Sequence, residues 1–261
     1  MKKIIFGVII VLIFSSIMVV YSLKSKPETK TIQNLQKISS EEFLPKLEGI
    51  WIRKEYIKIL EETKSPFQAI QGLLETQINI QKNKENNFEI NLIVNYHEGI
   101  TREIKKLIPL TENKFEISLT TNYTGEKYVI LVDNVEKSTQ LTLDYQKGKC
   151  NFIKIQEKNE EDFVNKIVLA GKYQDQSGRI FIFEPNRVAK WPNETFKYRV
   201  GLDFVFDSYN NIWLVDENDN NLNVFYTYEW KDDDLFIYKA SIPGEAVIPE
   251  NKPFVILEKM N

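Results

Sequence analysis

Cysteine and histidine are almost absent from this chain of 261 residues, which has only Cys150 and His97. A single cysteine excludes an internal disulfide, and without a histidine nearby it is more typical of a small buried hydrophobic residue than of a nucleophile. No second histidine and no nucleophile motif accompany His97, so neither a zinc site nor a catalytic triad is predicted.

Glycine and proline are also scarce, and positive and negative charges nearly balance. With 10 Gly, 9 Pro and 43% hydrophobic residues, the chain is neither low-complexity nor disordered in composition. A net charge of −3 gives no broad attraction for a polyanion, so nucleic acid is not expected as a partner. Because phosphate-binding glycine loops, Gly-x-Ser-x-Gly and His-Glu-x-x-His are missing, we expect a protein that is not an enzyme and holds no cofactor or metal.

One acidic segment has part of the pattern of a calcium loop. Oxygen-bearing side chains alternate at Asp216, Asn218 and Asn220, but the sixth position is Asn221 instead of glycine and the twelfth is Thr227 instead of glutamate. The segment therefore predicts a polar hairpin turn.

Charged residues are missing from Ile4 to Tyr21, directly after the positive Met1 to Lys3. This pattern is typical of an export signal, and the apolar run is also long enough to form a helix that spans a bilayer. Residues 1–22 are therefore expected to be a cleaved signal peptide or a membrane anchor, with a linker at 23–40. Either outcome places the rest of the chain outside the cytoplasm, secreted, periplasmic or anchored.

Two short helices are predicted near residues 55–72. Tyr56, Ile57 and Leu60 recur at helical spacing, and the sequence from Ser65 has the form of a helix cap with Pro66 at the first helical position. A further helical turn is expected near residues 39–44, followed by a brief strand at 47–52.

From Leu73 onward the hydrophobic period is two. Phe88 to Tyr96 and Phe115 to Leu119 alternate apolar and polar residues, and similar runs recur to the end of the chain. Many short strands joined by polar turns predict an all-β fold of antiparallel meanders, in a barrel or sandwich. An acidic stretch from Glu157 to Asp162 interrupts the series, and Ile167 to Tyr173 is expected to resume it as a strand. We therefore expect two barrel-like domains, 41–160 and 161–261, or one larger β domain at 41–261.

Gly49-Ile50-Trp51, on the first strand of the meander, resembles the Gly-x-Trp signature of lipocalins and other calycins, and Gly171-Lys172-Tyr173 resembles a weaker second copy. The resemblance implies one antiparallel barrel, or two in tandem, with a ligand cup or a packed interior. It assigns structural roles to Gly49, Trp51, Gly171 and Tyr173. Residues 47–69 and 170–206 also resemble uncharacterised exported proteins of AT-rich bacteria, which implies a compartment and a source but no activity.

Aromatic residues supply the candidate ligand contacts. Tyr226, Tyr228 and Trp230 share one face of a predicted strand with Val224, and Trp213 is a further candidate, as is Trp191. These residues form either an apolar ligand surface or the filled interior of a barrel.

The expected function is a non-catalytic binding or interaction module of the bacterial cell envelope that holds a small apolar or amphipathic ligand. The alternative is an envelope scaffold with a filled core and a protein partner, and a third hypothesis is an enzyme with two facing carboxylates. A ligand cavity distinguishes the first from the second, and perturbed carboxylate pKa values would indicate the third.

Overall fold

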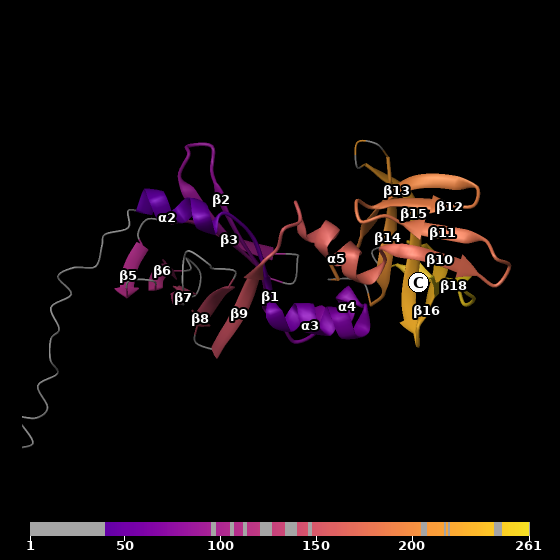
Figure 1. Cartoon of the computed structure of the whole chain (residues 1–261), viewed down its shortest axis with the longest axis horizontal. Coiled ribbons are helices and arrows are strands. Elements are labelled where there is room, and N and C mark those ends of the chain that lie inside the picture. Colours follow the sequence, from indigo (N-terminus) through magenta and orange to yellow (C-terminus); the bar gives the residue numbers. More distant parts are fainter. Residues whose placement is uncertain are drawn as a thin grey trace, which may run out of the picture. The chain divides into compact units, whose positions relative to one another are not determined.

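The structure of the chain is a computed structural model that describes residues 40–94, 98–104, 107–111, 114–120, 127–133, 140–145, 148–204, 208–216, 218, 220–242 and 247–260 (Figure 1). The predicted signal or anchor at 1–22, the linker up to residue 39 and His97 lie outside the described residues. Among the residues that are described, no helix is long and apolar enough to cross a membrane.

The fold is all-β with antiparallel sheets and only 16% helix, as the sequence predicts. The first sheet is a curled half-barrel of nine strands in the order β4-β3-β2-β1-β9-β8-β7-β6-β5. Its strands are β1 (Gly49–Arg53), β2 (Glu75–Lys82), β3 (Phe88–Val94), β4 (Glu98–Glu103), β5 (Leu107–Thr111), β6 (Lys114–Thr120), β7 (Lys127–Asp133), β8 (Gln140–Tyr145) and β9 (Gly148–Lys154).

The second sheet closes into an eight-stranded barrel, which is compatible with a lipocalin-like fold. Strands pair in sequence order from β10 to β16, and β18 closes the barrel between β16 and β10, while β17 pairs with β16 alone. These strands are β10 (Gly171–Asp175), β11 (Ile180–Phe183), β12 (Val188–Trp191), β13 (Glu194–Val200), β14 (Asn210–Val215), β15 (Asn221–Lys231), β16 (Asp234–Ser241), β17 (Ile248–Pro249) and β18 (Val255–Lys259).

The helices are short and lie before or between strands. Those in the described residues are α2 (Ser40–Leu47), α3 (Lys54–Thr63), α4 (Pro66–Ile70) and α5 (Glu160–Val168). The predicted cap of α4 is present, because Ser65 Oγ accepts a hydrogen bond from the Gln68 amide at 3.1 Å.

Helix α5 corrects the expectation of an acidic loop followed by a strand from Ile167. Asn159 caps the helix by accepting from the Asp162 amide at 2.8 Å, and three acidic residues in the first turn suit the positive end of the helix dipole. Val164 and Val168 are buried one turn apart, so Ile167 belongs to the last helical turn and the strand begins at Gly171.

Both sheets begin with the same arrangement of a helix followed by a Gly-x-aromatic strand. Trp51 Nε1 donates a hydrogen bond to the Leu47 carbonyl at 2.9 Å, and Tyr173 Oη donates to the Leu169 carbonyl at 2.6 Å. In each case the acceptor lies four residues earlier, and both aromatic side chains are buried. The ring therefore ties the first strand of its sheet to the residue at or just after the end of the helix.

The last strand of each sheet places a lysine opposite the aromatic residue. Lys154 on β9 faces Trp51, with its Nζ 5.6 Å from the ring centroid, and Lys259 on β18 faces Tyr173. Glycine leaves room for the first lysine, because a Cβ on Gly49 would lie 2.8 Å from Lys154 Cε and the φ of +131° disfavours other residues.

Buried apolar side chains of the described residues form two hydrophobic cores. One fills the curled sheet and includes Phe43 of α2, whose ring centroid lies 4.3 Å from that of Phe115. The other fills the closed barrel and extends onto α3, α4 and α5. Helices α3 and α4, inserted between two strands of the first sheet, thus contribute their apolar face to the core of the second.

Candidate functional site

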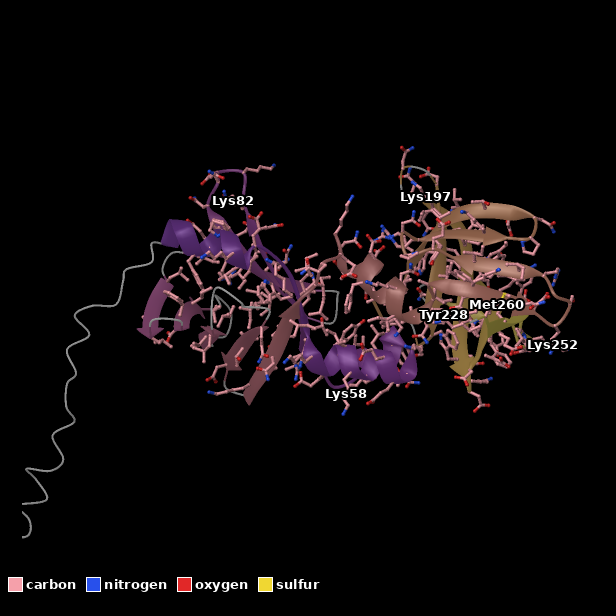
Figure 2. All side chains as sticks on the ribbon, in the orientation of Figure 1. Lys58, Lys82, Lys197, Tyr228, Lys252 and Met260 are labelled. Atoms are coloured by element: carbon pink, nitrogen blue, oxygen red, sulfur yellow. The ribbon has the colours of Figure 1, made fainter. Side chains whose placement is uncertain are left out.

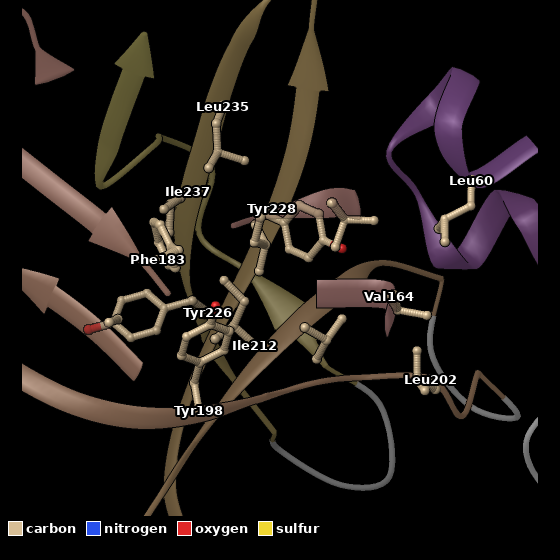
Figure 3. Close-up of a cluster of buried hydrophobic side chains, with 14 of the residues drawn as sticks. Leu60, Val164, Phe183, Tyr198, Leu202, Ile212, Tyr226, Tyr228, Leu235 and Ile237 are labelled. Carbon is tan, nitrogen blue, oxygen red and sulfur yellow. The ribbon is translucent and has the colours of Figure 1, made fainter. Parts of the chain in front are cut away.

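Side chains from all eight strands fill the interior of the closed barrel. Figure 2 shows the side chains of both sheets, and Figure 3 shows part of this core. The buried members from the strands are Tyr173, Phe181, Phe183, Ala189, Trp191, Tyr198, Val200, Ile212, Leu214, Tyr226, Tyr228, Leu235, Ile237, Val255 and Leu257. The middle of the barrel is therefore a packed core instead of a ligand cup.

Helix α5 covers one end of this barrel, which we call the helix end. Tyr198 Oη donates to Asn165 Oδ1 at 2.6 Å, and Trp230 Nε1 donates to the Val168 carbonyl at 3.0 Å. The fully buried Asn165 also donates to the carbonyls of Glu184 and Pro185 at 2.9 and 3.2 Å. These hydrogen bonds satisfy buried polar groups that would otherwise be unpaired, so we assign the helix end a structural role in closing the barrel.

The opposite end of the barrel carries a cluster of four aromatic side chains, Trp191, Phe196, Tyr226 and Phe254, which we call the aromatic end. The Trp191 ring lies edge-on to Phe196 and Tyr226, with centroid distances of 4.9 and 5.3 Å, and stacks on Phe254 at 5.8 Å with an interplanar angle of 22°. These distances lie in the favourable range for aromatic pairs.

Burial is uneven across the aromatic end. Trp191 and Tyr226 are 7% and 8% exposed, whereas Phe254 is 44% exposed. Trp191 Nε1 is buried and donates a hydrogen bond to no group in the described part of the chain. A buried donor without an acceptor is unusual in a folded protein and points to a missing partner.

One lysine completes this end. Lys239 pairs with Tyr226 across β16 and β15, and its Nζ lies 4.9 Å from the Phe254 ring centroid. Among the described residues, no carboxylate forms an ion pair with Lys239. Exposed apolar side chains also occur on the neighbouring strands, at Leu222, Val224 and Ile248. The aromatic end is thus mainly apolar and carries both Lys239 and the carboxylate of Glu194. Burial, with an added contribution from the charge of Glu194, raises the pKa of Tyr226.

The structure places the four aromatic residues predicted as ligand contacts at different positions. Tyr226 belongs to the aromatic end, Tyr228 lies in the barrel core, and Trp230 lies at the helix end. Trp213 is half-buried on the outer face, where its ring meets Phe225 edge-on at 4.9 Å. The alternation along β15 gave the shared face, but the strand runs the length of the barrel and separates its residues along the axis.

A second candidate is a cleft of about 320 Å³ beside Trp213 on the outer face. Glu160, Glu161, Arg199 and Asp203 are among its lining residues. Burial, with a smaller contribution from Glu161, raises the pKa of Glu160. Glu161, however, forms ion pairs with both Arg187 and Arg199, so this charged group holds α5 against the barrel.

The acidic segment that begins at Asp216 makes the side-chain to backbone hydrogen bonds of a polar turn. Asp216 Oδ1 accepts hydrogen bonds from the amides of Asn218 and Asn220 at 2.8 and 2.9 Å. In the described part of the chain, no group of three or more His, Cys, Asp or Glu side chains is arranged to hold a metal ion.

Sequence reasoning did not single out Phe196, Lys239 or Phe254. Trp191 was recognised only as an aromatic residue with two interpretations. Each of Trp191 and Phe254 adjoins a proline at the end of a strand, which is the one local signal that marks a position at a barrel rim.

Comparisons with known proteins add little to this geometry. No family model matches the chain, and no curated protein shows a significant match. Among solved structures, the chain is similar to a protein of unknown function of the DUF3598 family from Nostoc punctiforme, with 10% identity and a TM-score of 0.24 over 84% of this chain and 96% of that one.

Proposed function

We propose that this chain is a non-catalytic binding module of the bacterial cell envelope that works outside the cytoplasm and holds a small amphipathic ligand at the aromatic end of its barrel. The observation that carries the proposal is Trp191, whose indole is buried while its N–H lacks an acceptor in the described part of the chain. An unpaired buried donor costs roughly 1–3 kcal/mol, which a ligand oxygen would offset.

The filled interior argues against a ligand deep in the barrel, so the proposal places the ligand at the rim. Tyr228 and Trp230, both considered as ligand contacts from the sequence, pack with the core. Tyr226 remains a candidate, because it contacts both Trp191 and Phe254. The compartment rests on the apolar run in residues 1–22 and the lysines before it, which lie outside the described residues.

A scaffold that binds a protein partner is the second candidate function. Two observations favour it: the packed barrel core, and strands β4 and β5, each of which pairs with one neighbour among the described residues. Edge strands of this kind accept an added strand from another chain.

Native mass spectrometry of the full chain purified from cells tests the proposal. We expect a bound small molecule on the parent and on Trp213→Phe, a matched control on the outer face, and its loss from Trp191→Phe, which lacks the indole N–H. A parent that carries no small molecule would contradict the proposal. A co-purifying polypeptide in its place would favour the scaffold.

A further inference from the structure

We infer that the ligand is a planar ring bearing a carboxylate, and that the side chain of Phe254 occupies the place of that ring. This inference rests on the proposed function and adds the chemical class of the ligand. Phe254 stacks on Trp191 at 5.8 Å, contacts Tyr226 at 6.0 Å, and has the Lys239 ammonium 4.9 Å from its centroid. Each of these contacts is one that a bound aromatic ring would make.

Phe254 can leave this place without disturbing the barrel. It precedes β18, and its backbone is held by the amide hydrogen bond to the Ile237 carbonyl at 2.8 Å. Its side chain is 44% exposed, whereas the Trp191 beneath it is 7% exposed. Rotation about χ1 therefore uncovers the Trp191 face while every strand pair remains intact.

The side chains around the position of Phe254 favour a flat ring as the ligand. Phe196 and Tyr226 stand at interplanar angles of 78° and 65° to Trp191, so they flank its ring and leave the face that Phe254 now covers. A saturated ring is thicker than an aromatic one and lacks the π face that stacks on indole.

One buried donor and one exposed cation favour an anionic oxygen group on that ring. Trp191 Nε1 is a buried donor without an acceptor, and Lys239 has no ion-pair partner, each within the described part of the chain. Lys231 provides the contrast, because it lies 5.0 Å over the Phe236 ring but is paired with Glu229 at 2.6 Å. A carboxylate supplies both an acceptor for the indole and an opposite charge for Lys239.

Calorimetric titration of the full chain with 2-naphthoate tests this chemistry. We expect Phe254→Ala to bind 2-naphthoate roughly tenfold more tightly than the parent, because the competing side chain is removed. In this variant the neutral 2-naphthamide and the non-planar cyclohexanecarboxylate should each bind roughly tenfold more weakly than 2-naphthoate. Adding Lys239→Met should abolish the preference for the acid over the amide. Phe236→Ala removes another lysine-covered ring of the same barrel and should leave the affinity of the parent unchanged.

An unchanged affinity in Phe254→Ala, or equal binding of acid and amide, would overturn the inference. Should Phe254→Ala fail to fold, Phe254→Leu keeps an apolar side chain without the planar ring, and the NMR signal of the Trp191 indole N–H reports binding directly. A shift on addition of 2-naphthoate supports the inference, and a constant signal overturns it. An aliphatic molecule found by native mass spectrometry would leave the proposed function standing and overturn the aromatic ligand, whereas a bare chain together with no naphthoate binding would overturn both.

Discussion

Replacing Trp51 with alanine tests whether the Gly-x-Trp strand anchors the first sheet. The side chain is fully buried, its Nε1 is bonded to the Leu47 carbonyl at 2.9 Å, and its ring is faced by Lys154. Lys154 Nζ also donates to the Lys46 carbonyl at 3.2 Å, and partial burial lowers the pKa of this lysine. The substitution therefore removes a large apolar group, a buried hydrogen bond and a cation–π contact together.

The expected cost follows from these three losses. Truncation of a buried tryptophan costs about 3–5 kcal/mol, and the unpaired Leu47 carbonyl places the value toward the upper end of that range. Whole domains are stable by about 5–15 kcal/mol, so the variant should be close to unfolding. At about 2–4 °C per kcal/mol for a chain of this size, the melting temperature should fall by roughly 6–20 °C.

Thermal unfolding followed by circular dichroism measures this change in the full chain. Trp51→Phe should fall between the parent and Trp51→Ala, because it keeps most of the ring volume and loses the N–H donor. Trp213→Ala is the control, since Trp213 is half-buried on the outer face of the other sheet. A Trp51→Ala variant that melts with the parent would refute the anchoring role.

Two further predictions concern the helix end of the barrel. Asn165→Ala should cost about 2 kcal/mol in urea unfolding, because it leaves the buried Tyr198 Oη without its acceptor and removes the side-chain donor to the carbonyls of Glu184 and Pro185. An unchanged urea midpoint would contradict the structural role of Asn165. Burial raises the pKa of Tyr173, Tyr198 and Tyr228, so their neutral forms stabilise the barrel fully below the unfolded pKa of about 10, and this contribution is lost as pH rises beyond it. In an alkaline absorbance titration these phenols should ionise only as near-ultraviolet circular dichroism is lost, and ionisation of all 12 tyrosines in the native state would contradict it.

The fold class could be predicted from the sequence because alternation is a local signal. Phe88 to Tyr96 contains strand β3, Phe115 to Leu119 lies within strand β6, and Ser65 caps α4 as its spacing indicates. Helix α5 was missed because its acidic first turn resembles a solvated loop. The signal was nevertheless present in Asn159 and Asp162, three residues apart in the form of a cap, ahead of an apolar pair one turn apart.

The candidate site depends on closure of the barrel, which no local pattern specifies. Trp191 and Phe254 lie on β12 and at the start of β18, far apart in the sequence, and they meet because β18 pairs with both β10 and β16. The first sheet, which the same alternation predicts equally well, remains a curled half-barrel. Local periodicity therefore predicts strands and their faces, whereas closure depends on which strands become neighbours in three dimensions.

The pairing of β10 with β18 also limits how early the barrel can close during folding. Tyr173 faces Lys259 across this pair, so the barrel cannot close until nearly all of its strands have been made and released. Contacts of such high sequence separation form slowly, because the entropy of closing a long loop must be met first. Until then β10 and β16 each offer an open edge to which another chain can pair. Pairing of β18 with β10 and β16 therefore covers both open edges and lowers the risk that the unfinished barrel aggregates.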